Sequence, residues 1–155
     1  MVGAVVQKKS ISFEPCFHDD MVLIVPPGHR LADCRQVSID DLASEPFVLR
    51  EKGSGTRLAT ERALQAAGNL HLSDLQIVSE MGSAEAIRQA VRVGLGCSII
   101  SRCAVTDDLE HGLLYALDLE GVQLSRQFHL VWHNQRTLSP LALAFRSFLL
   151  SENLS

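Results

Sequence analysis

The strongest constraint on the fold is an order of strand, polar turn and helix that occurs twice in succession. Residues 47–50 form a short apolar run, residues 51–56 a turn rich in glycine, serine and threonine, and residues 58–67 a helical pattern. Residues 75–93 repeat this order. Successive units of this kind indicate parallel strands joined by helical crossovers. The sequence therefore predicts an α/β fold in which both helices begin at the same edge of one sheet.

Both turns combine small residues with hydroxyl groups directly before a helix. The amino end of a helix presents unpaired N–H groups and a partial positive charge, so an anion or a small polar ligand can bind there. Ser83 is a good N-cap, and Glu85 places a negative charge in the first turn of its helix. Taken alone, the first turn is equally consistent with an ordinary, well-capped connection between a strand and a helix.

Composition excludes several functional classes. The chain has 155 residues, a formal net charge of -4 and 46% hydrophobic residues, which is typical of a globular domain with a substantial core. An acidic chain without a basic cluster is not expected to bind nucleic acid by itself. No apolar run approaches the roughly 20 residues of a membrane span, and the first residues lack a signal-peptide pattern. We therefore expect a cytoplasmic protein.

The four cysteines are expected to be free thiols. Cys16, Cys34, Cys97 and Cys103 share no C-x-x-C spacing and have no histidine pair at zinc-ligand intervals. The Cys-Phe-His-Asp-Asp run at 16–20 suggests a metal site, but its side chains would alternate between the two faces of an extended chain. The sequence therefore predicts neither a metal nor a cofactor.

The first part of the chain offers only part of a sheet. Residues 2–6 and 21–25 read as strands, the second ended by Pro26-Pro27-Gly28, and residues 38–42 read as one helical turn capped by Ser38. Because the later elements need a larger sheet for packing, we expect the chain to be a piece of a larger protein.

The pattern changes after Arg102. Residues 113–119 and 127–132 read as two strands of an extended pair, and Ser139-Pro140 opens a final helix. The apolar residues of this helix fall at helical spacing, so we expect them to pack into a core. They are Leu141, Ala144, Phe145, Phe148 and Leu149.

Five segments in a fixed order carry a family likeness. They are Asp-Met-Val-Leu-Ile-Val-Pro-Pro-Gly-His-Arg-Leu at 20–31, Glu-Pro-Phe-Val-Leu-Arg-Glu with Gly-Ser-Gly-Thr-Arg at 45–57, Met-Gly-Ser-Ala-Glu-Ala-Ile at 81–87, Gly-Leu-Gly-Cys-Ser-Ile-Ile-Ser at 94–101, and Leu-Ser-Pro at 138–140 with Ala144-Phe145. Together they resemble the effector-binding domain of LysR-type transcriptional regulators over nearly the whole chain. The Gly-Ser-Gly-Thr-Arg turn is similar to that of regulators of carbon fixation or of sulfur and aromatic metabolism.

This resemblance implies a type 2 periplasmic-binding-protein-like α/β fold with two lobes. Residues 1–31 would supply part of lobe I and the first crossing strand, residues 32–101 a complete lobe II, and residues 102–155 the return to lobe I. In this family a winged helix-turn-helix binds DNA, and the sequence contains neither that domain nor the opening part of lobe I. DNA binding would thus belong to the full-length protein, which is expected to form a homodimer or a higher homo-oligomer.

On this basis we expect a small anionic or carboxylate metabolite to bind in the interlobe cleft, between the two turns. Backbone N–H groups and hydroxyls would hold its oxygens, and Cys97 would line the floor. Arg50 and Arg57 would either reach the ligand or form surface ion pairs. The predicted effector site consists of Arg50, Gly53, Ser54, Gly55, Thr56, Gly82, Ser83 and Cys97.

Two other classes share the scaffold. A solute-binding receptor would need a signal or lipid-anchor segment, which the sequence lacks. A prephenate-dehydratase-like enzyme would use a Thr-Arg pair, which Thr56-Arg57 superficially matches, but the histidines are scattered and no base is paired with a nucleophile. The sequence therefore favours a sensor over an enzyme.

Overall fold

The computed structural model describes residues 10–68 and 70–151, so the strand predicted at 2–6 lies outside the described residues. The chain divides into two compact units, Asp20–Ser125 and Met1–Asp19 with Arg126–Ser155. The larger unit contains all of the predicted lobe II and extends beyond it at both ends, because residues 20–31 and 102–125 contribute strands to the same sheet.

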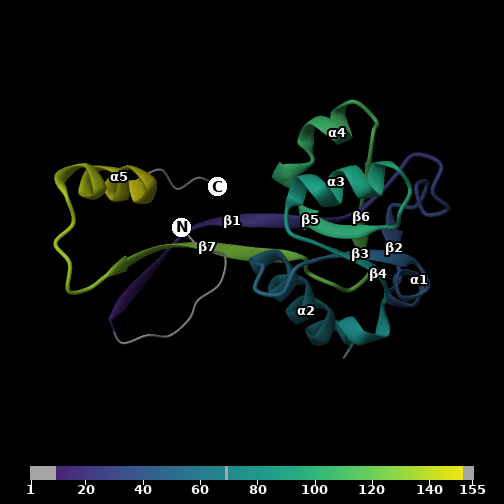
Figure 1. Cartoon of the computed structure of the whole chain (residues 1–155), viewed down its shortest axis with the longest axis horizontal. Coiled ribbons are helices and arrows are strands. Elements are labelled where there is room, and N and C mark those ends of the chain that lie inside the picture. Colours follow the sequence, from purple (N-terminus) through teal and green to yellow (C-terminus); the bar gives the residue numbers. More distant parts are fainter. Residues whose placement is uncertain (1–9, 69, 152–155) are drawn as a thin grey trace. The chain divides into compact units, whose positions relative to one another are not determined.

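The larger unit is built on a mixed sheet (Figure 1). Its central strand, β1 (Ile11–Val25), lies between β5 (Ser98–Ser101) and β6 (Tyr115–Leu119) and is antiparallel to both. The short strand β2 (Gln36–Val37) pairs in parallel with β6.

The two predicted strand–turn–helix units extend this sheet. Strands β3 (Pro46–Arg50) and β4 (Gln76–Met81) are parallel, as predicted, and a parallel bridge from Phe47 to Cys97 joins β3 to the β5 side. Because β3 and β4 run in the same direction, the turns that follow them lie at the same edge.

Helices cover both faces of the sheet. After β3 comes α2 (Gly55–Gly68) and after β4 comes α3 (Ala84–Arg92), and they lie on opposite sides of the strands in Figure 1. The shorter helical elements are α1 (Ile39–Ala43), η1 (Leu72–Asp74), η2 (Arg102–Ala104) and α4 (Thr106–Glu110).

The predicted helix caps are confirmed. The Ser38 hydroxyl oxygen accepts a hydrogen bond from the Asp41 backbone N–H at 3.0 Å, and Ser83 accepts one from Ala86 at 3.1 Å. Each bond satisfies a backbone donor that the first turn of a helix would otherwise leave unpaired.

Alternation along β1 divides the core into two clusters. Met21, Leu23 and Val25 face the cluster that includes Leu64 of α2, whereas Val22 and Ile24 face the cluster formed with α3. All five β1 residues are almost completely buried. A strand that is apolar on both faces is typical of a sheet covered by helices on both sides.

In the smaller unit, β7 (Ser125–His133) pairs with β1, and α5 (Pro140–Ser151) follows it. The prediction that residues 113–119 and 127–132 pair with each other is wrong, because β6 and β7 each pair with β1 instead. A strand pattern in the sequence identifies strands but not their partners.

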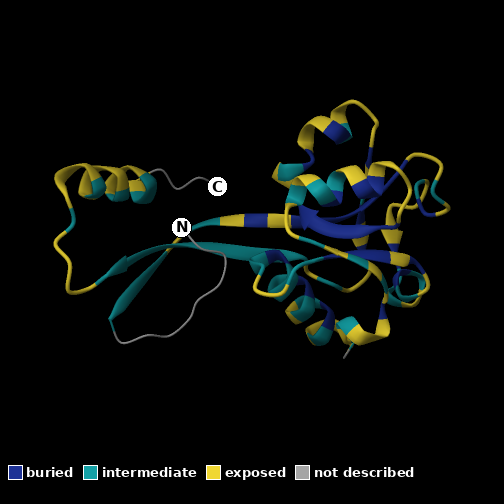
Figure 2. Ribbon diagram, viewed as in Figure 1, coloured by how far each residue is buried: buried dark blue, intermediate teal, exposed yellow. Residues whose placement is uncertain are grey.

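The predicted packing of α5 is also wrong. Its cap is present, since Ser139 accepts a hydrogen bond from the Ala142 N–H at 3.2 Å, but no residue of the helix is buried. Leu141 is 80% exposed, and Phe145 and Phe148 are each 57% exposed. Figure 2 shows α5 in yellow and teal, the colours of exposed and partly buried residues. None of the described helices combines the length and the apolar character needed to cross a membrane.

Candidate functional site

The two polar turns lie side by side in the larger unit. Arg50 at the end of β3 pairs with Met81 at the end of β4, and the Glu51 N–H donates to the Met81 carbonyl at 3.0 Å. The structure therefore brings together the segments 51–56 and 82–83, from which α2 and α3 begin.

The first turn is closed by its own backbone. Gly53 has a φ of 90°, a conformation that glycine adopts without steric cost. The Ser54 N–H then donates to the Glu51 carbonyl at 3.2 Å, and the Ser54 carbonyl accepts from Leu58 at 3.1 Å as α2 begins. Ser54 is half-buried, whereas Thr56 is only 5% exposed. Ser54 is thus the more accessible hydroxyl of this turn.

The second turn is open to solvent. Gly82 and Ser83 are both exposed, and the Ser83 oxygen already accepts the capping hydrogen bond of α3. A hydroxyl can accept and donate at the same time, so Ser83 retains a hydrogen that it can donate to a ligand.

Arg50 and Arg57 form ion pairs and hydrogen bonds beside the two turns. Arg50 Nη2 lies 2.8 Å from Glu51 Oε1 and donates to the Gly82 carbonyl at 3.3 Å. Arg57 Nη1 lies 2.8 Å from Glu80 Oε1 and donates to the Arg50 carbonyl at 3.0 Å. The Arg50 guanidinium also lowers the pKa of Glu51. Both arginines therefore hold the turns together in this structure.

Cys97 lies away from the turns. It pairs with Phe47 near the start of β3, whereas the turns follow the ends of β3 and β4, and its side chain is fully buried. Burial raises the pKa of its thiol to about 12, with a further contribution from the negative charge of Glu45. Such a thiol is a core residue rather than an exposed reactive group.

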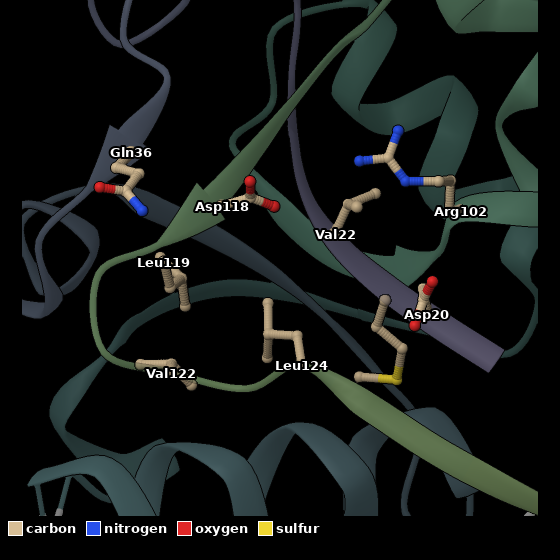
Figure 3. Close-up of a pocket in the computed structure, with 9 residues that line it drawn as sticks. Asp20, Val22, Gln36, Arg102, Asp118, Leu119, Val122 and Leu124 are labelled. Carbon is tan, nitrogen blue, oxygen red and sulfur yellow. The ribbon is translucent and has the colours of Figure 1, made fainter. Parts of the chain in front are cut away.

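A separate cavity of about 340 Å³ lies in the same unit (Figure 3). It is formed by residues of β1, β2 and β6, by Arg102 and by the segment after β6. None of the residues of the predicted effector site lines it.

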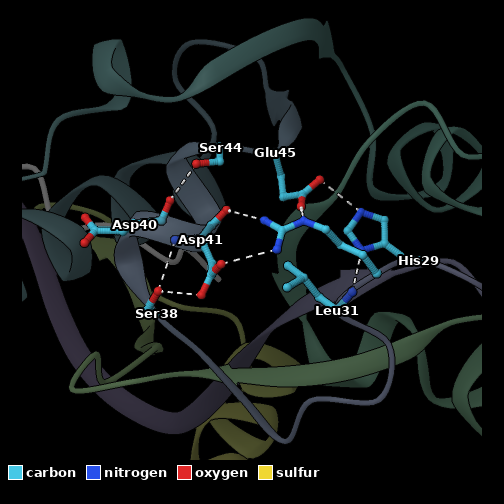
Figure 4. Close-up of polar contacts among 8 residues, drawn as sticks. His29, Leu31, Ser38, Asp40, Asp41, Ser44 and Glu45 are labelled. Carbon is cyan, nitrogen blue, oxygen red and sulfur yellow. Dashed lines mark hydrogen bonds and ion pairs between the residues drawn. The ribbon is translucent and has the colours of Figure 1, made fainter.

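A polar network around Glu45 was not predicted (Figure 4). The Glu45 carboxylate is buried, accepts a hydrogen bond from Arg30 and lies 3.3 Å from His29 Nε2. Arg30 also contacts Asp41, whose pKa is lowered by the Ser38 hydroxyl and by this guanidinium. Through these contacts, His29 and Arg30 hold the segment after β1 against α1 and against Glu45 just beyond it. The only sequence signal was the paired basic residues after Pro26-Pro27-Gly28, which do not reveal their partners.

The comparison with protein families identifies this architecture. Residues 2–153 match the model of the LysR substrate binding domain. The chain belongs to this family, and the predicted LysR likeness and periplasmic-binding-protein-like α/β fold are confirmed.

Its relatives are transcriptional regulators. The chain is 40% identical over 152 residues to the RuBisCO operon transcriptional regulator of Allochromatium vinosum, covering 98% of this chain and 49% of that protein. It is 39% identical over 121 residues to the HTH-type transcriptional regulator CbbR of Cereibacter sphaeroides, covering 78% of this chain and 38% of the regulator. The chain thus spans about half the length, or less, of these relatives.

Two solved structures have a similar fold. The CcmR regulatory domain of Synechocystis PCC6803, in complex with 2-PG, has a TM-score of 0.83 and 28% identity, covering 97% of this chain and 70% of that one. The effector binding domain of QuiR, in complex with shikimate, has a TM-score of 0.84 and 22% identity, covering 98% of this chain and 69% of that one. The latter likeness concerns the fold alone.

Proposed function

We propose that this chain is the effector-sensing part of a LysR-type transcriptional regulator, and that the turns at Gly53–Thr56 and Gly82–Ser83 bind a small anionic or carboxylate metabolite. The observation that carries the proposal is the pairing of β3 with β4, which starts α2 and α3 from neighbouring turns. Two structural relatives, the CcmR domain with 2-PG and the QuiR domain with shikimate, hold small ligands and support a sensing role.

The turns offer suitable hydrogen-bond donors for an anion. The first N–H groups of α2 and α3 supply backbone donors and a partial positive charge, and Ser54 and Ser83 add hydroxyls. A hydrogen bond to a charged group contributes about 1.5–3 kcal/mol, so two or three bring the affinity into the micromolar range. Cys97 and the buried Thr56 do not belong to the direct contacts in this proposal.

The ion-paired arginines give the site a way to respond to its ligand. Arg50 contacts Glu51 and the Gly82 carbonyl, so it holds the second turn against the first. An anion at this edge competes with Glu51 for the Arg50 guanidinium. Ligand binding would then change how tightly the two turns are connected. A ligand can shift a conformational equilibrium only if it interacts differently with the two states, and this competition provides such a difference.

Control of transcription is proposed for the full-length protein. The matched relatives are about twice as long as this chain or longer, and they are described as regulators. We propose that the ligand alters how paired subunits present their DNA-binding domains in the cytoplasm. The role is sensing rather than catalysis.

Calorimetric titration of the full chain with a panel of small carboxylates and phosphates, including 2-PG and shikimate, tests the site. We expect at least one of them to bind, and Ser54→Ala and Ser83→Ala each to weaken its binding by about tenfold.

Ser38→Ala is the matched control, because Ser38 makes the same capping bond as Ser83 but lies outside the two turns. Because the Ser38 hydroxyl also donates to Asp41 Oδ2 at 2.7 Å, this variant should lose at least as much stability as Ser83→Ala, without losing affinity. Unchanged affinity in both Ser54→Ala and Ser83→Ala would remove the turns from the binding site.

A further inference from the structure

The cavity in Figure 3 lies at a different part of the sheet from the two turns. The strand order is β2-β6-β1-β5, with β3 attached beyond β5 through the bridge from Phe47 to Cys97. The cavity is built from β1, β6 and β2, with Arg102 directly after β5, so β5 separates most of its lining from β3 and β4. All of its lining residues belong to the Asp20–Ser125 unit.

One part of the lining is polar. Its members come from three strands and the start of η2, and within the described part of the chain their side chains form no hydrogen bond or ion pair with another residue. They are Asp20, Gln36, Arg102 and Asp118. In Figure 3 the Arg102 guanidinium and the Asp118 carboxylate lie on either side of Val22 and point toward each other.

Several arginines of this unit form ion pairs, as Arg88 does with Asp108 at 2.6 Å and Arg57 with Glu80 at 2.8 Å. Arg102 and Asp118 instead line one cavity without forming an ion pair. Two carboxylates and one guanidinium favour a ligand that has a cationic and an anionic group at the same time.

The other part of the lining is apolar. Met21 and Leu119 are each 3% exposed, and Val122 and Leu124 are half-buried. The Leu124 carbonyl accepts a hydrogen bond from the Met21 N–H at 2.9 Å, which fixes the segment after β6 against β1. This surface suits an aliphatic group.

We propose that this cavity is a second ligand site and that its ligand is an α-amino acid zwitterion with an aliphatic side chain. The ligand carboxylate pairs with Arg102, and the ammonium group donates to Asp118, which faces Arg102 across Val22 in Figure 3. The side chain lies against Leu119 and the neighbouring apolar residues. A volume of about 340 Å³ is at the small end of the range for ligand pockets and is large enough for a free amino acid.

This site goes beyond the proposed effector site and differs from it in ligand chemistry. The turns offer backbone donors and a partial positive charge for an anion, whereas the cavity has an excess of carboxylates and requires an ammonium group. A regulator with both sites would respond to two separate metabolites.

The test is a calorimetric titration of the full chain with L-leucine and L-valine. Two analogues of leucine separate the contributions: 4-methylpentanoate lacks the ammonium group, and 3-methylbutylamine lacks the carboxylate. We expect saturable binding of the amino acids and a loss of about tenfold or more with each analogue. The absence of saturable binding, or equal binding of either analogue, would overturn the proposal.

Substitutions locate the site. Arg102→Gln and Asp118→Asn should each weaken leucine binding about tenfold or more, because each removes one charged partner. Asp33→Asn is the matched control, since Asp33 is an exposed carboxylate of the same unit outside the cavity, and it should leave the affinity unchanged.

Ser83→Ala should also leave leucine binding unchanged, so failure of the effector site and failure of this site can be told apart. Unchanged leucine affinity in both Arg102→Gln and Asp118→Asn would contradict the proposed location. Arg102 and Asp118 are both exposed, so we expect each variant to fold, and melting curves would test this.

Discussion

Replacing Gly96 by alanine tests the connection between β3 and the rest of the sheet. An added Cβ would overlap the Pro46 carbonyl oxygen and lie 2.8 Å from the Pro46 carbonyl carbon. This obstacle is backbone and cannot rotate away. The same carbonyl accepts a hydrogen bond from the Cys97 N–H at 2.8 Å, and the Cys97 carbonyl accepts one from Val48 at 2.9 Å. The glycine at position 96 therefore permits the backbone bridge between Phe47 and Cys97. Among the described residues, this is the bridge that joins β3 to the β5 side of the sheet.

The expected loss follows from these contacts. Overpacking a tight site costs about 1–3 kcal/mol, and each backbone hydrogen bond that is broken removes about 0.5–1.5 kcal/mol. Moving β3 away from Cys97 breaks one or two such bonds, so we expect a total loss of about 2–5 kcal/mol. For a chain of this size that lowers the melting temperature by roughly 4–20 °C.

Thermal unfolding followed by circular dichroism measures this effect. Gly82→Ala is the matched control, because a Cβ at Gly82 would meet only Glu51 Oε2, at an ordinary distance of 3.8 Å. It should change stability by less than about 1 kcal/mol. If Gly96→Ala melted within roughly 2 °C of the unsubstituted chain, close approach at Pro46 would not be what selects glycine at this position.

Three further outcomes follow from buried or paired groups. Because burial raises the pKa of Cys97 to about 12, iodoacetamide at pH 8 should modify the exposed Cys34 but not Cys97 in the folded chain, as mass spectrometry would show. Asp108→Ala leaves two partly exposed arginines without their buried partner and should cost about 2 kcal/mol in a denaturant titration, and an unchanged midpoint would contradict this. The pKa of Asp41 is lowered by the Ser38 hydroxyl and a neighbouring guanidinium, so its ionised form stabilises the fold above its ordinary pKa near 4 and this contribution is lost as pH falls through the lowered value. Asp41→Asn should therefore make the melting temperature fall less steeply between about pH 5 and pH 2, and an identical slope would argue against it.

Helix starts were predictable because their causes are local. A cap is a hydrogen bond between a side chain and a backbone group three residues later, so the sequence around the cap contains most of the information. Ser38, Ser83 and Ser139 were all predicted as caps, and each makes the expected bond. Ile87, Ala90 and Val91 recur at helical spacing in the sequence, and they are the buried residues of α3.

Strand partners and helix burial were not predictable, because they depend on distant parts of the chain. The patterns of β6 and β7 showed two strands, but both pair with β1 rather than with each other. The apolar stripe of α5 indicated a buried face, yet Phe145 and Phe148 are mostly exposed within the described structure. An amphipathic pattern states what a helix can bury but not what lies opposite it.

The same distinction holds for the two candidate sites. The polar turns could be found from sequence, because strand, turn and helix are contiguous and two such units in succession meet at one edge of a parallel sheet. The ion pairs of Arg50 and Arg57 could not be predicted, since each depends on which carboxylate of the neighbouring segments comes within reach.

The sequence by itself determined the α/β class, the family, the helix starts and the position of the two turns. Only the tertiary structure decided that β1 is the common partner of β5, β6 and β7, and that Cys97 lies in the core. It alone also brought Asp20, Arg102 and Asp118 to one cavity across nearly a hundred residues of chain. The physical reason is range: capping and periodicity act over a few residues, whereas pairing, burial and cavities depend on contacts between segments that meet only when the chain folds.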